Sequence, residues 1–120
     1  MNVAVIGASD DLERYSYLAV KLLSEKGHTV FPVHPSLKDI AGLKVYASIG
    51  DVPETIDTVS LYVSPQISSR IAADILRKAP RRIIFNPDAE NPALEKAATN
   101  QGIHVLRACT LTMLKTNQFD

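Results

Sequence analysis

The sequence predicts an α/β fold with a parallel sheet in one domain. Short runs rich in valine and isoleucine alternate with stretches in which apolar residues recur every three or four positions. The first pattern is typical of strands buried on both faces, and the second of amphipathic helices. A chain of 120 residues has room for one hydrophobic core. We therefore expect a Rossmann-like, doubly wound parallel sheet of about five strands joined by right-handed crossovers.

Five apolar runs are the expected strands, and one long irregular segment interrupts their alternation with helices. The second run stops at His34-Pro35. The stretch that follows, residues 36–49, is expected to be irregular, with a short extended piece at 44–46. The tail after the last strand has no predicted structure. The strands are expected at residues 3–6, 28–33, 58–63, 82–85 and 104–106.

Three amphipathic stretches are the expected helices. The first closes at Gly27, because glycine readily takes the conformation that follows a helix end. The second and third begin with Ser64-Pro65 and Asn91-Pro92, in which a capping side chain precedes a proline that suits the first helical position. Their inner faces are predicted to carry Tyr15, Leu18, Ala19, Leu22 and Leu23 in the first helix, Ile67, Ile71, Ala72, Ile75 and Leu76 in the second, and Leu94, Ala97 and Ala98 in the third.

The composition excludes several classes of protein. Acidic and basic residues number 13 each, which argues against nucleic acid or an anionic membrane as the main partner, because both usually require a basic excess. No apolar run approaches the roughly 18 residues of a membrane span. The only cysteine, Cys109, excludes an internal disulfide, and no leader segment is visible. We expect a soluble, cytoplasmic protein.

The expected ligand site lies beyond the carboxyl ends of the strands, where doubly wound sheets bind their ligands. The first strand is followed by Gly7-Ala8-Ser9, whose single glycine permits a sharp turn and the close approach of a phosphate. Ser9 or Asp10 is expected to cap the first helix or to contact the anion. Arg14, the first cation after this turn, is interpreted either as a phosphate clamp or as a solvated residue.

The end of the second strand separates classes of nucleotide ligand. Folds that bind NAD usually place an acidic residue there for the ribose, and NADP favours a nearby arginine. Here the strand ends at His34, and the nearest cation is Lys38. The sequence therefore favours a nucleotide other than a nicotinamide cofactor. Tyr17 faces either this cleft or the core, whereas Tyr15 is expected in the core.

Neither a metal site nor a catalytic constellation is visible. His28 and His104 lie at predicted strand starts, away from the expected site, and His34 has no second ligand at a metal-like spacing. No Ser-His-Asp set, Cys-His pair or carboxylate dyad stands at a suggestive spacing. Cys109 is expected to be partly buried and inert, and Asp88 is interpreted as a turn residue. We therefore expect a binding protein rather than an enzyme.

Several short motifs carry a family resemblance through their order. They are VAVIGAS followed by RYSY, then GHTVFPVHP, DVPETIDTV, YVSP, NPDAEN and GIHV with a cysteine. Together they resemble the small stand-alone CoA-binding domain proteins, a family similar to the N-terminal CoA-binding domain of the succinyl-CoA synthetase α subunit. The resemblance covers residues 2–109. It implies a Rossmann-like fold that holds coenzyme A through its 3′-phospho-ADP part, without the ligase domain and its chemistry.

The resemblance also implies a set of site residues. The turn after the first strand would meet the phosphates, the residues after the second would flank the adenosine, and those after the third and fourth would wall and close the site. In that order they are Gly7, Ala8 and Ser9; His34 and Pro35; Val63, Ser64 and Pro65; and Asn86 and Pro87.

Three positions depart from the family's pattern. Asp88 stands where the family has a glycine, which predicts a different turn. His34 replaces an asparagine, which predicts a contact that is sensitive to pH near neutrality. Leu37 replaces a phosphate-binding lysine, and Lys38 is one position out of register. Together these departures predict that binding is either weakened or lost.

The sequence thus predicts non-catalytic binding of coenzyme A or a short acyl-CoA at the carboxyl ends of the strands. Two alternatives stay open at this point. One is an NAD(P)-binding redox or sensor domain, and the other is a subunit of a larger acyl-CoA-processing complex. The sequence does not indicate which protein partner or which oligomeric state the chain has.

Overall fold

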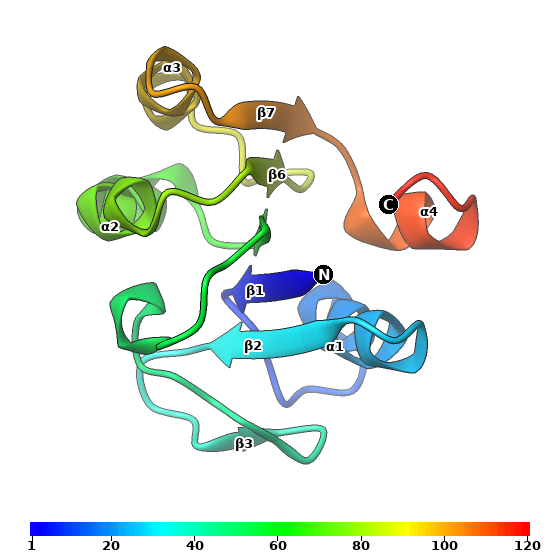
Figure 1. Ribbon diagram of the computed structural model, residues 1–120. Coiled ribbons are helices and arrows are strands. Elements are labelled where there is room, and N and C mark those ends of the chain that lie inside the picture. Colours follow the sequence, from blue (N-terminus) through cyan, green and yellow to red (C-terminus); the bar gives the residue numbers. More distant parts are fainter.

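A five-stranded parallel sheet forms the centre of the computed structural model, which describes residues 1–120 (Figure 1). The strand order is β2-β1-β5-β6-β7, and every neighbouring pair is parallel. This confirms the predicted Rossmann-like, doubly wound α/β fold. The strands are β1 (Asn2–Ile6), β2 (Thr29–Val33), β5 (Thr58–Leu61), β6 (Arg82–Phe85) and β7 (His104–Arg107).

Helices cover both faces of this sheet, as Figure 1 shows. One layer is formed by α1 (Tyr15–Glu25) and α4 (Thr110–Lys115), which contact each other. The other is formed by α2 (Pro65–Lys78), α3 (Pro92–Asn100) and the 3-10 turn η1 (Ile49–Asp51). Side chains alternate between the faces of a strand, so β1 sends Ala4 and Ile6 into one buried cluster and Val3 and Val5 into the other.

The direction in which successive strands are added to the sheet reverses at β1. The chain leaves β1 through α1 to add β2 on one side, and it later returns to add β5 on the other side of β1. The carboxyl ends of β1 and β5 therefore lie side by side while their following segments diverge to opposite faces. Ligands of doubly wound sheets bind at such a switch point.

The helix starts follow the predicted capping residues in two of three cases. The Ser64 hydroxyl accepts from the Ile67 N–H at 3.4 Å, and the Asn91 side chain accepts from the Leu94 N–H at 3.2 Å. Proline occupies the first position of both α2 and α3. Both predicted cap-and-proline devices are confirmed, because capping depends on neighbouring residues alone.

The predicted inner face of α1 is confirmed at Ala19 and Leu23, which are buried, and is wrong at Tyr15 and Leu18. Tyr15 is 66% exposed and Leu18 39% exposed, whereas Ser16 and Ala19 are buried. The face that packs on the sheet is formed by Ser16, Ala19, Val20 and Leu23, all of which are buried. Ile67, predicted on the inner face of α2, is also exposed.

Two elements lie in segments for which little regular structure was predicted, and one of them overlaps the short extended piece expected at 44–46. The short hairpin of β3 (Asp39–Ile40) and β4 (Leu43–Lys44) turns at Ala41 and Gly42, both with positive φ. Helix α4 occupies the tail. Both elements are too short to show a hydrophobic period of their own.

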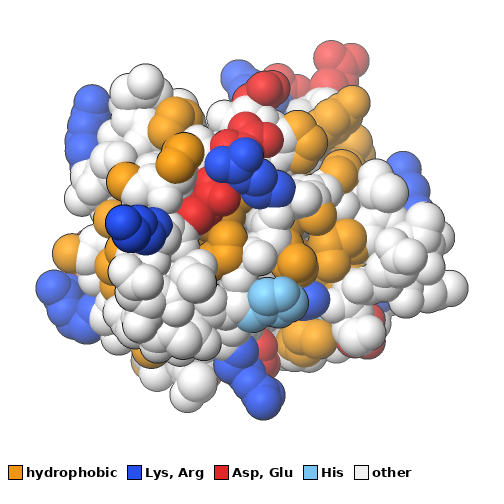
Figure 2. Space-filling view, turned by 90° about the horizontal axis from the view of Figure 1, so that it is seen from above, with side chains coloured by type: hydrophobic (Ala, Val, Ile, Leu, Met, Phe, Trp, Pro, Cys, Tyr) orange, Lys and Arg blue, Asp and Glu red, His pale blue; other side chains and the backbone are white.

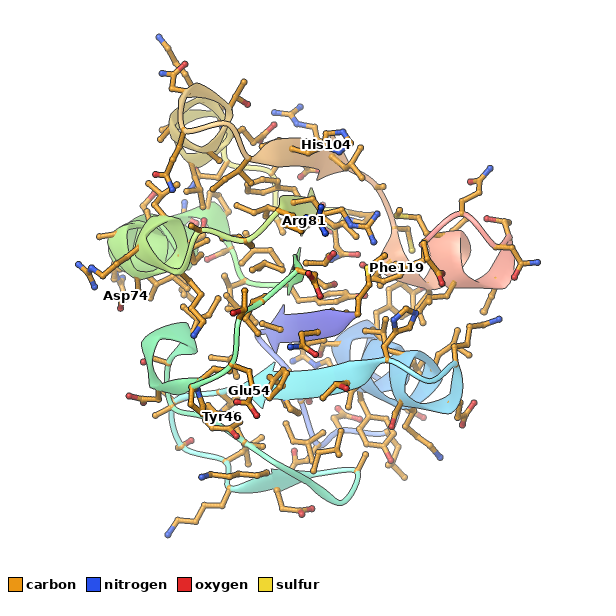
Figure 3. All side chains as sticks on the ribbon, in the orientation of Figure 1. Tyr46, Glu54, Asp74, Arg81, His104 and Phe119 are labelled. Carbon is orange, nitrogen blue, oxygen red and sulfur yellow. The ribbon has the colours of Figure 1, made fainter.

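The C-terminal segment returns to the amino ends of the strands. Phe119 is buried between α4 and the sheet (Figure 3). The Arg82 guanidinium lies 4.4 Å from the centre of its ring and donates to its backbone carbonyl. The His28 ring packs edge-on against the Phe119 ring, with 5.1 Å between the ring centroids. One aromatic residue thus fixes the end of the chain to β6 and to the start of β2.

The surface mixes both signs of charge. Figure 2 views the molecule from above Figure 1, from the side of α3 and β7, and shows acidic, basic and hydrophobic side chains interspersed on that face. This agrees with the equal numbers of acidic and basic residues in the chain. None of the helices combines the length and the apolar character needed to cross a membrane.

Phe119→Ala is expected to lower the free energy of unfolding by about 3 kcal/mol, because it removes a buried ring and leaves a cavity. Denaturation with urea, followed by circular dichroism, measures the change. Tyr15→Ala truncates an exposed aromatic side chain and should cost less than about 1 kcal/mol. Equal losses in the two variants would contradict an anchoring role for Phe119.

Acidification is expected to lower the stability of the contacts around Phe119 by protonating His28. Burial, followed by the charges of the N-terminal amine and Arg82, lowers the pKa of His28 below 6.5, and only the Asp120 carboxylate opposes this. The unfolded chain therefore binds the proton more readily, so this contribution to stability is complete above pH 6.5 and is lost as the pH falls below it. Melting temperatures measured from pH 7.5 to pH 5, at intervals of about 0.5 pH unit, follow this loss of stability.

His28→Gln should flatten this pH dependence, and the exposed His104 provides the control. His104→Gln should keep the pH dependence of the unmodified protein. The same slope in the His28 variant and in the unmodified protein would show that other groups cause the loss.

Candidate functional site

The turn after β1 brings three strand ends together at Gly7. Its φ is +85°, and its N–H and that of Ala8 both donate to the Val33 carbonyl at the end of β2, at 3.1 and 3.2 Å. A Cβ atom on Gly7 would lie 2.8 Å from the Val63 Cγ1 just beyond β5. Glycine is therefore required both by the backbone conformation and by the close approach of the neighbouring strand.

This geometry limits which groups of the turn can meet a ligand. Both N–H groups are used within the fold and are not free for a phosphate. The Ala8 side chain is buried in the cluster beneath α1. Only Gly7 itself and Ser9, with its partly exposed side chain, remain available to a ligand.

Two hollows meet at Gly7. The first, which we call the apolar lobe, has a volume of about 260 Å³ and lies between the ends of β1, β2 and β5 and the first turns of α2. The second, the polar lobe, has a volume of about 300 Å³ and lies over the start of α1. The apolar lobe is lined by Ile6, Gly7, Val33, Pro35, Ala47, Ser48, Ile49, Val63, Ile67, Arg70, Ile71 and Asp74, and the polar lobe by Gly7, Ser9, Glu13, Arg14, Tyr15, Ser16 and Tyr62.

The polar lobe is shaped by a helix start without a side-chain cap. Arg14 stands at the N-cap of α1, no acidic residue lies in the first turn, and the N–H groups of Tyr15, Ser16 and Tyr17 donate to no protein acceptor. The predicted cap is wrong, because the Ser9 hydroxyl accepts from the Asp11 N–H at 3.0 Å instead. Free N–H groups at a helix start, together with an arginine, favour an anion.

Two tyrosines border this region in different ways. Tyr62 lines the polar lobe, but its hydroxyl is buried without a hydrogen-bond partner, and burial raises its pKa to about 12. It therefore stays neutral at physiological pH and supplies no charge. Tyr17 is half-buried against the cluster beneath α1 and lines neither lobe. Of its two predicted positions, the structure favours the core.

The segment after β2 forms one wall of the apolar lobe. The Nδ1 atom of His34 accepts from the N–H groups of Ser36 and Leu37, both at 3.1 Å, which puts the ring proton on Nε2. The histidine thus holds its own loop, much as an asparagine side chain does in an Asx turn. Pro35 lines the lobe, whereas His34 does not.

The segment after β5 forms the opposite wall. Val63 lines the apolar lobe, but Ser64 and Pro65 do not. Ser64 is the cap of α2, and the Pro65 carbonyl accepts from the Asn91 side chain at 3.3 Å. These two predicted site residues therefore orient α2 rather than border the hollow.

Asn86 was predicted to close the site, and the structure corrects this. It is 1% exposed, and its amide donates to the Ser60 hydroxyl at 3.1 Å and to the Leu61 carbonyl at 3.0 Å. Its side-chain oxygen accepts from the Thr110 N–H at 2.9 Å. Asn86 therefore joins β5, β6 and the start of α4 inside the protein, and it lines neither lobe.

The turn after Asn86 is closed by a hydrogen bond and holds Asp88 in a left-handed conformation. The Ala89 N–H donates to the Asn86 carbonyl at 2.9 Å, and Asp88 has a φ of +74°. Aspartate tolerates this left-handed conformation better than most residues. Asp88 is thus accommodated in this turn without a glycine. Pro87 is exposed on this turn and lines neither lobe.

Cys109 precedes α4 and lines neither lobe. Burial opposes ionisation of its thiol, but hydrogen bonds from Thr112 and from the Leu111 N–H outweigh this and lower its pKa, with help from Lys115. No three His, Cys, Asp or Glu side chains come together as a metal site would require.

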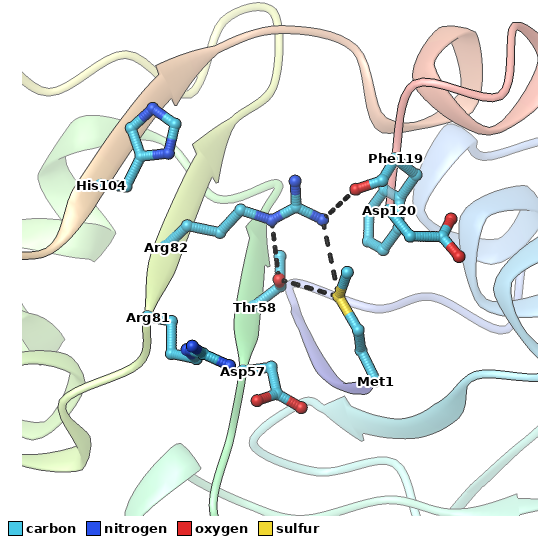
Figure 4. Close-up of a pocket in the computed structure, with 8 residues that line it drawn as sticks. All are labelled: Met1, Asp57, Thr58, Arg81, Arg82, His104, Phe119 and Asp120. Carbon is cyan, nitrogen blue, oxygen red and sulfur yellow. Dashed lines mark hydrogen bonds between the residues drawn. The ribbon is translucent and has the colours of Figure 1, made fainter.

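A third hollow, of about 370 Å³, lies at the opposite edge of the sheet (Figure 4). Its central group, Arg82, donates to the Thr58 hydroxyl at 2.8 Å and to the Phe119 carbonyl. The carboxylates of Asp57 and Asp120 offset the arginine charges there. This hollow surrounds the anchored C-terminal segment and lies away from the switch point.

The structure adds site residues that the sequence analysis did not find. Ile67 and Arg70 line the apolar lobe from α2, and Ser16 lines the polar lobe from α1. Ile67 and Arg70 are three residues apart and so share a helix face near the carboxyl ends of the strands. That position, one turn after the cap at Ser64, is the signal that would have indicated them.

Comparison with known proteins decides the family. The family model described as "CoA binding domain" matches residues 1–115. This chain belongs to that CoA-binding domain family. The predicted resemblance to small stand-alone CoA-binding domain proteins is thereby confirmed.

Two curated relatives show the range of lengths in which the domain occurs. The Bacillus subtilis protein YneT is 27% identical over 102 residues, which cover 81% of this chain and 76% of YneT. An ADP-forming acetate–CoA ligase of Methanocaldococcus jannaschii is 35% identical over 84 residues, but these cover 70% of this chain and only 12% of the ligase. The chain therefore corresponds to a small part of such ligases.

Solved structures agree with the fold. A crystal structure of an uncharacterized protein has a TM-score of 0.88 and 34% identity, with 98% of this chain and 97% of the other covered. A hypothetical protein from Pyrococcus horikoshii OT3 has a TM-score of 0.90 and 28% identity, with 95% and 81% covered. Both are similar to this chain over nearly its whole length.

Asn86→Ala is expected to lower the free energy of unfolding by roughly 3 kcal/mol, because the Ser60 hydroxyl and the Thr110 N–H lose a buried partner. Asn100→Ala is the matched control, since Asn100 is exposed and its side chain makes no hydrogen bond. Thermal unfolding of both variants measures the difference. A small loss for Asn86→Ala, equal to that of the control, would contradict its structural role.

Proposed function

We propose that this protein binds coenzyme A or a short acyl-CoA through the 3′-phospho-ADP part, without catalysing a reaction on it. The observation that carries the proposal is the pair of lobes that meet at Gly7, at the switch point of a CoA-binding domain. An apolar hollow and an anion-favouring helix start share one residue, as a ligand with an aromatic base and a pyrophosphate requires.

In this proposal the adenosine occupies the apolar lobe. Pro35 and Val63 approach from the two flanking loops, and Ile67 approaches from α2 with 43% of its surface exposed. An apolar side chain this exposed beside a hollow gains free energy when a base covers it, at about 25 cal/mol for each Å² of apolar surface buried.

The pyrophosphate then crosses Gly7 into the polar lobe. The free N–H groups of Tyr15 and Ser16 lie there together with the Arg14 side chain. Arg14 is exposed and forms no ion pair in the structure, so it is free to meet a phosphate. The Glu13 carboxylate also borders the lobe. Its negative charge disfavours a second anion there and leaves the solvent-facing side of the lobe to the pantetheine arm.

A binding role is favoured over an enzymatic one because none of the serines that line the lobes is hydrogen-bonded to a histidine or a carboxylate. The Cys109 thiol and the Tyr62 hydroxyl are placed outside or beneath the lobes. The longer ligases to which the chain is similar carry most of their length outside the matched part. Work as a subunit beside further acyl-CoA-processing domains is the second candidate, and this similarity is what favours it.

Thermal unfolding with coenzyme A, acetyl-CoA, NADH, NADPH and ATP in parallel tests the proposal. A ligand at 100 times its dissociation constant adds about 2.7 kcal/mol, which raises the melting temperature of a domain of this size by several degrees. We expect the largest shifts with coenzyme A and acetyl-CoA. A shift with NADH and none with coenzyme A would replace the proposal by a nicotinamide-binding function.

Two site variants and one control locate the binding. Arg14→Gln and Ile67→Ser should each weaken coenzyme A binding by about five- to tenfold, since each removes on the order of 1 kcal/mol of contact. Lys96→Gln changes the same charge on the exposed side of α3 and should bind like the unmodified protein. Unchanged binding in both site variants would move the ligand to another surface.

A further inference from the structure

One cation borders the apolar lobe without a partner. Arg70 lies on α2, three residues after Ile67, and is the only lysine or arginine among the residues that line this lobe. Its guanidinium forms no ion pair and no hydrogen bond in the structure. An unpaired guanidinium at the rim of an apolar hollow is positioned to meet an anionic group on whatever fills the hollow.

The acidic residue nearest to it in sequence on this helix face is engaged elsewhere. Asp74 also lines the apolar lobe, four residues after Arg70, and this spacing would allow the two to pair. Asp74, labelled on α2 in Figure 3, instead accepts from Arg77 at 2.9 Å. Arg77 thereby partly neutralises the carboxylate and leaves Arg70 free.

The second arginine of the site lies in the other lobe. Arg14 borders the polar lobe, and only Gly7 is shared between the two hollows. A ligand that carries two separate anionic groups, one on each side of Gly7, would satisfy both arginines. Coenzyme A has this chemistry, because its ribose carries a phosphate in addition to the pyrophosphate.

We propose that Arg70 recognises the 3′-phosphate on the ribose of coenzyme A and so makes this site prefer coenzyme A over dephospho-CoA. This inference rests on the proposed binding of coenzyme A with its adenosine in the apolar lobe. A ribose at the mouth of that lobe directs its phosphate toward the rim, where the planar guanidinium offers two parallel N–H donors.

The size of the preference follows from the exposure of Arg70. Exposed ion pairs are weakened by solvent and salt, so a phosphate contact here is worth about a fivefold difference in affinity rather than several orders of magnitude. Most of this difference should vanish in about 0.5 M salt, where charges on the surface are strongly screened.

Calorimetric titration of the full chain with coenzyme A and with dephospho-CoA at low salt tests the inference. The unmodified protein should bind coenzyme A about fivefold more tightly than dephospho-CoA. Arg70→Gln should bind both ligands with the affinity that the unmodified protein has for dephospho-CoA. Arg70→Lys should keep part of the preference, because it keeps the charge but loses the two parallel donors.

Arg81→Gln is the matched control, since it removes the same charge at the opposite edge of the sheet. It should keep the full preference. If Arg70→Gln keeps the preference as well, or if the unmodified protein binds both ligands equally, the role of Arg70 is overturned while coenzyme A binding stands. If the unmodified protein binds neither ligand, the proposed function fails and this inference fails with it.

Discussion

The arrangement of the site depends on the contact between the turn at Gly7 and the two strands beside it. Two N–H groups of the turn share the Val33 carbonyl, and the side chain of Val63 lies where a Cβ of residue 7 would be. These contacts hold the ends of β1, β2 and β5 within one small region. Both lobes border this turn, so the same constraint determines the shape of the apolar lobe and the distance from it to the start of α1.

A second set of contacts fixes the elements that the turn does not reach. Asn86 ties β5 and β6 to α4, and the Asn91 side chain donates to the Pro65 carbonyl and to the Ser68 hydroxyl at 2.8 Å. The two asparagines follow the same strand, five residues apart. Buried amides with several partners specify one arrangement of the helices, because any other arrangement would leave polar groups unpaired.

The sequence was informative where local rules decide the structure. Runs of valine and isoleucine and the caps at Ser64 and Asn91 predicted strands and helix starts correctly, and alternation of the elements predicted the edge at which both lobes lie. It was misleading where tertiary packing decides. The rotation of α1 left Tyr15 exposed, and Asn86, although it follows a strand as a ligand contact would, turns inward to satisfy buried groups. Neighbouring residues carry no signal for such a choice.

Of the three departures from the family's pattern, two concern the shape of the backbone and one concerns contact with the ligand. His34 and Asp88 hold the loop and the turn, because an imidazole nitrogen accepts two N–H groups of the loop and an aspartate tolerates a positive φ. Leu37 differs, since it packs against the cluster beneath α1 and offers no charge to a phosphate. Lys38, the cation of this loop, lines neither lobe, so the site can draw a cation from the helix across the apolar lobe instead. Arg70 occupies that position, so loss of the loop lysine does not require loss of phosphate recognition.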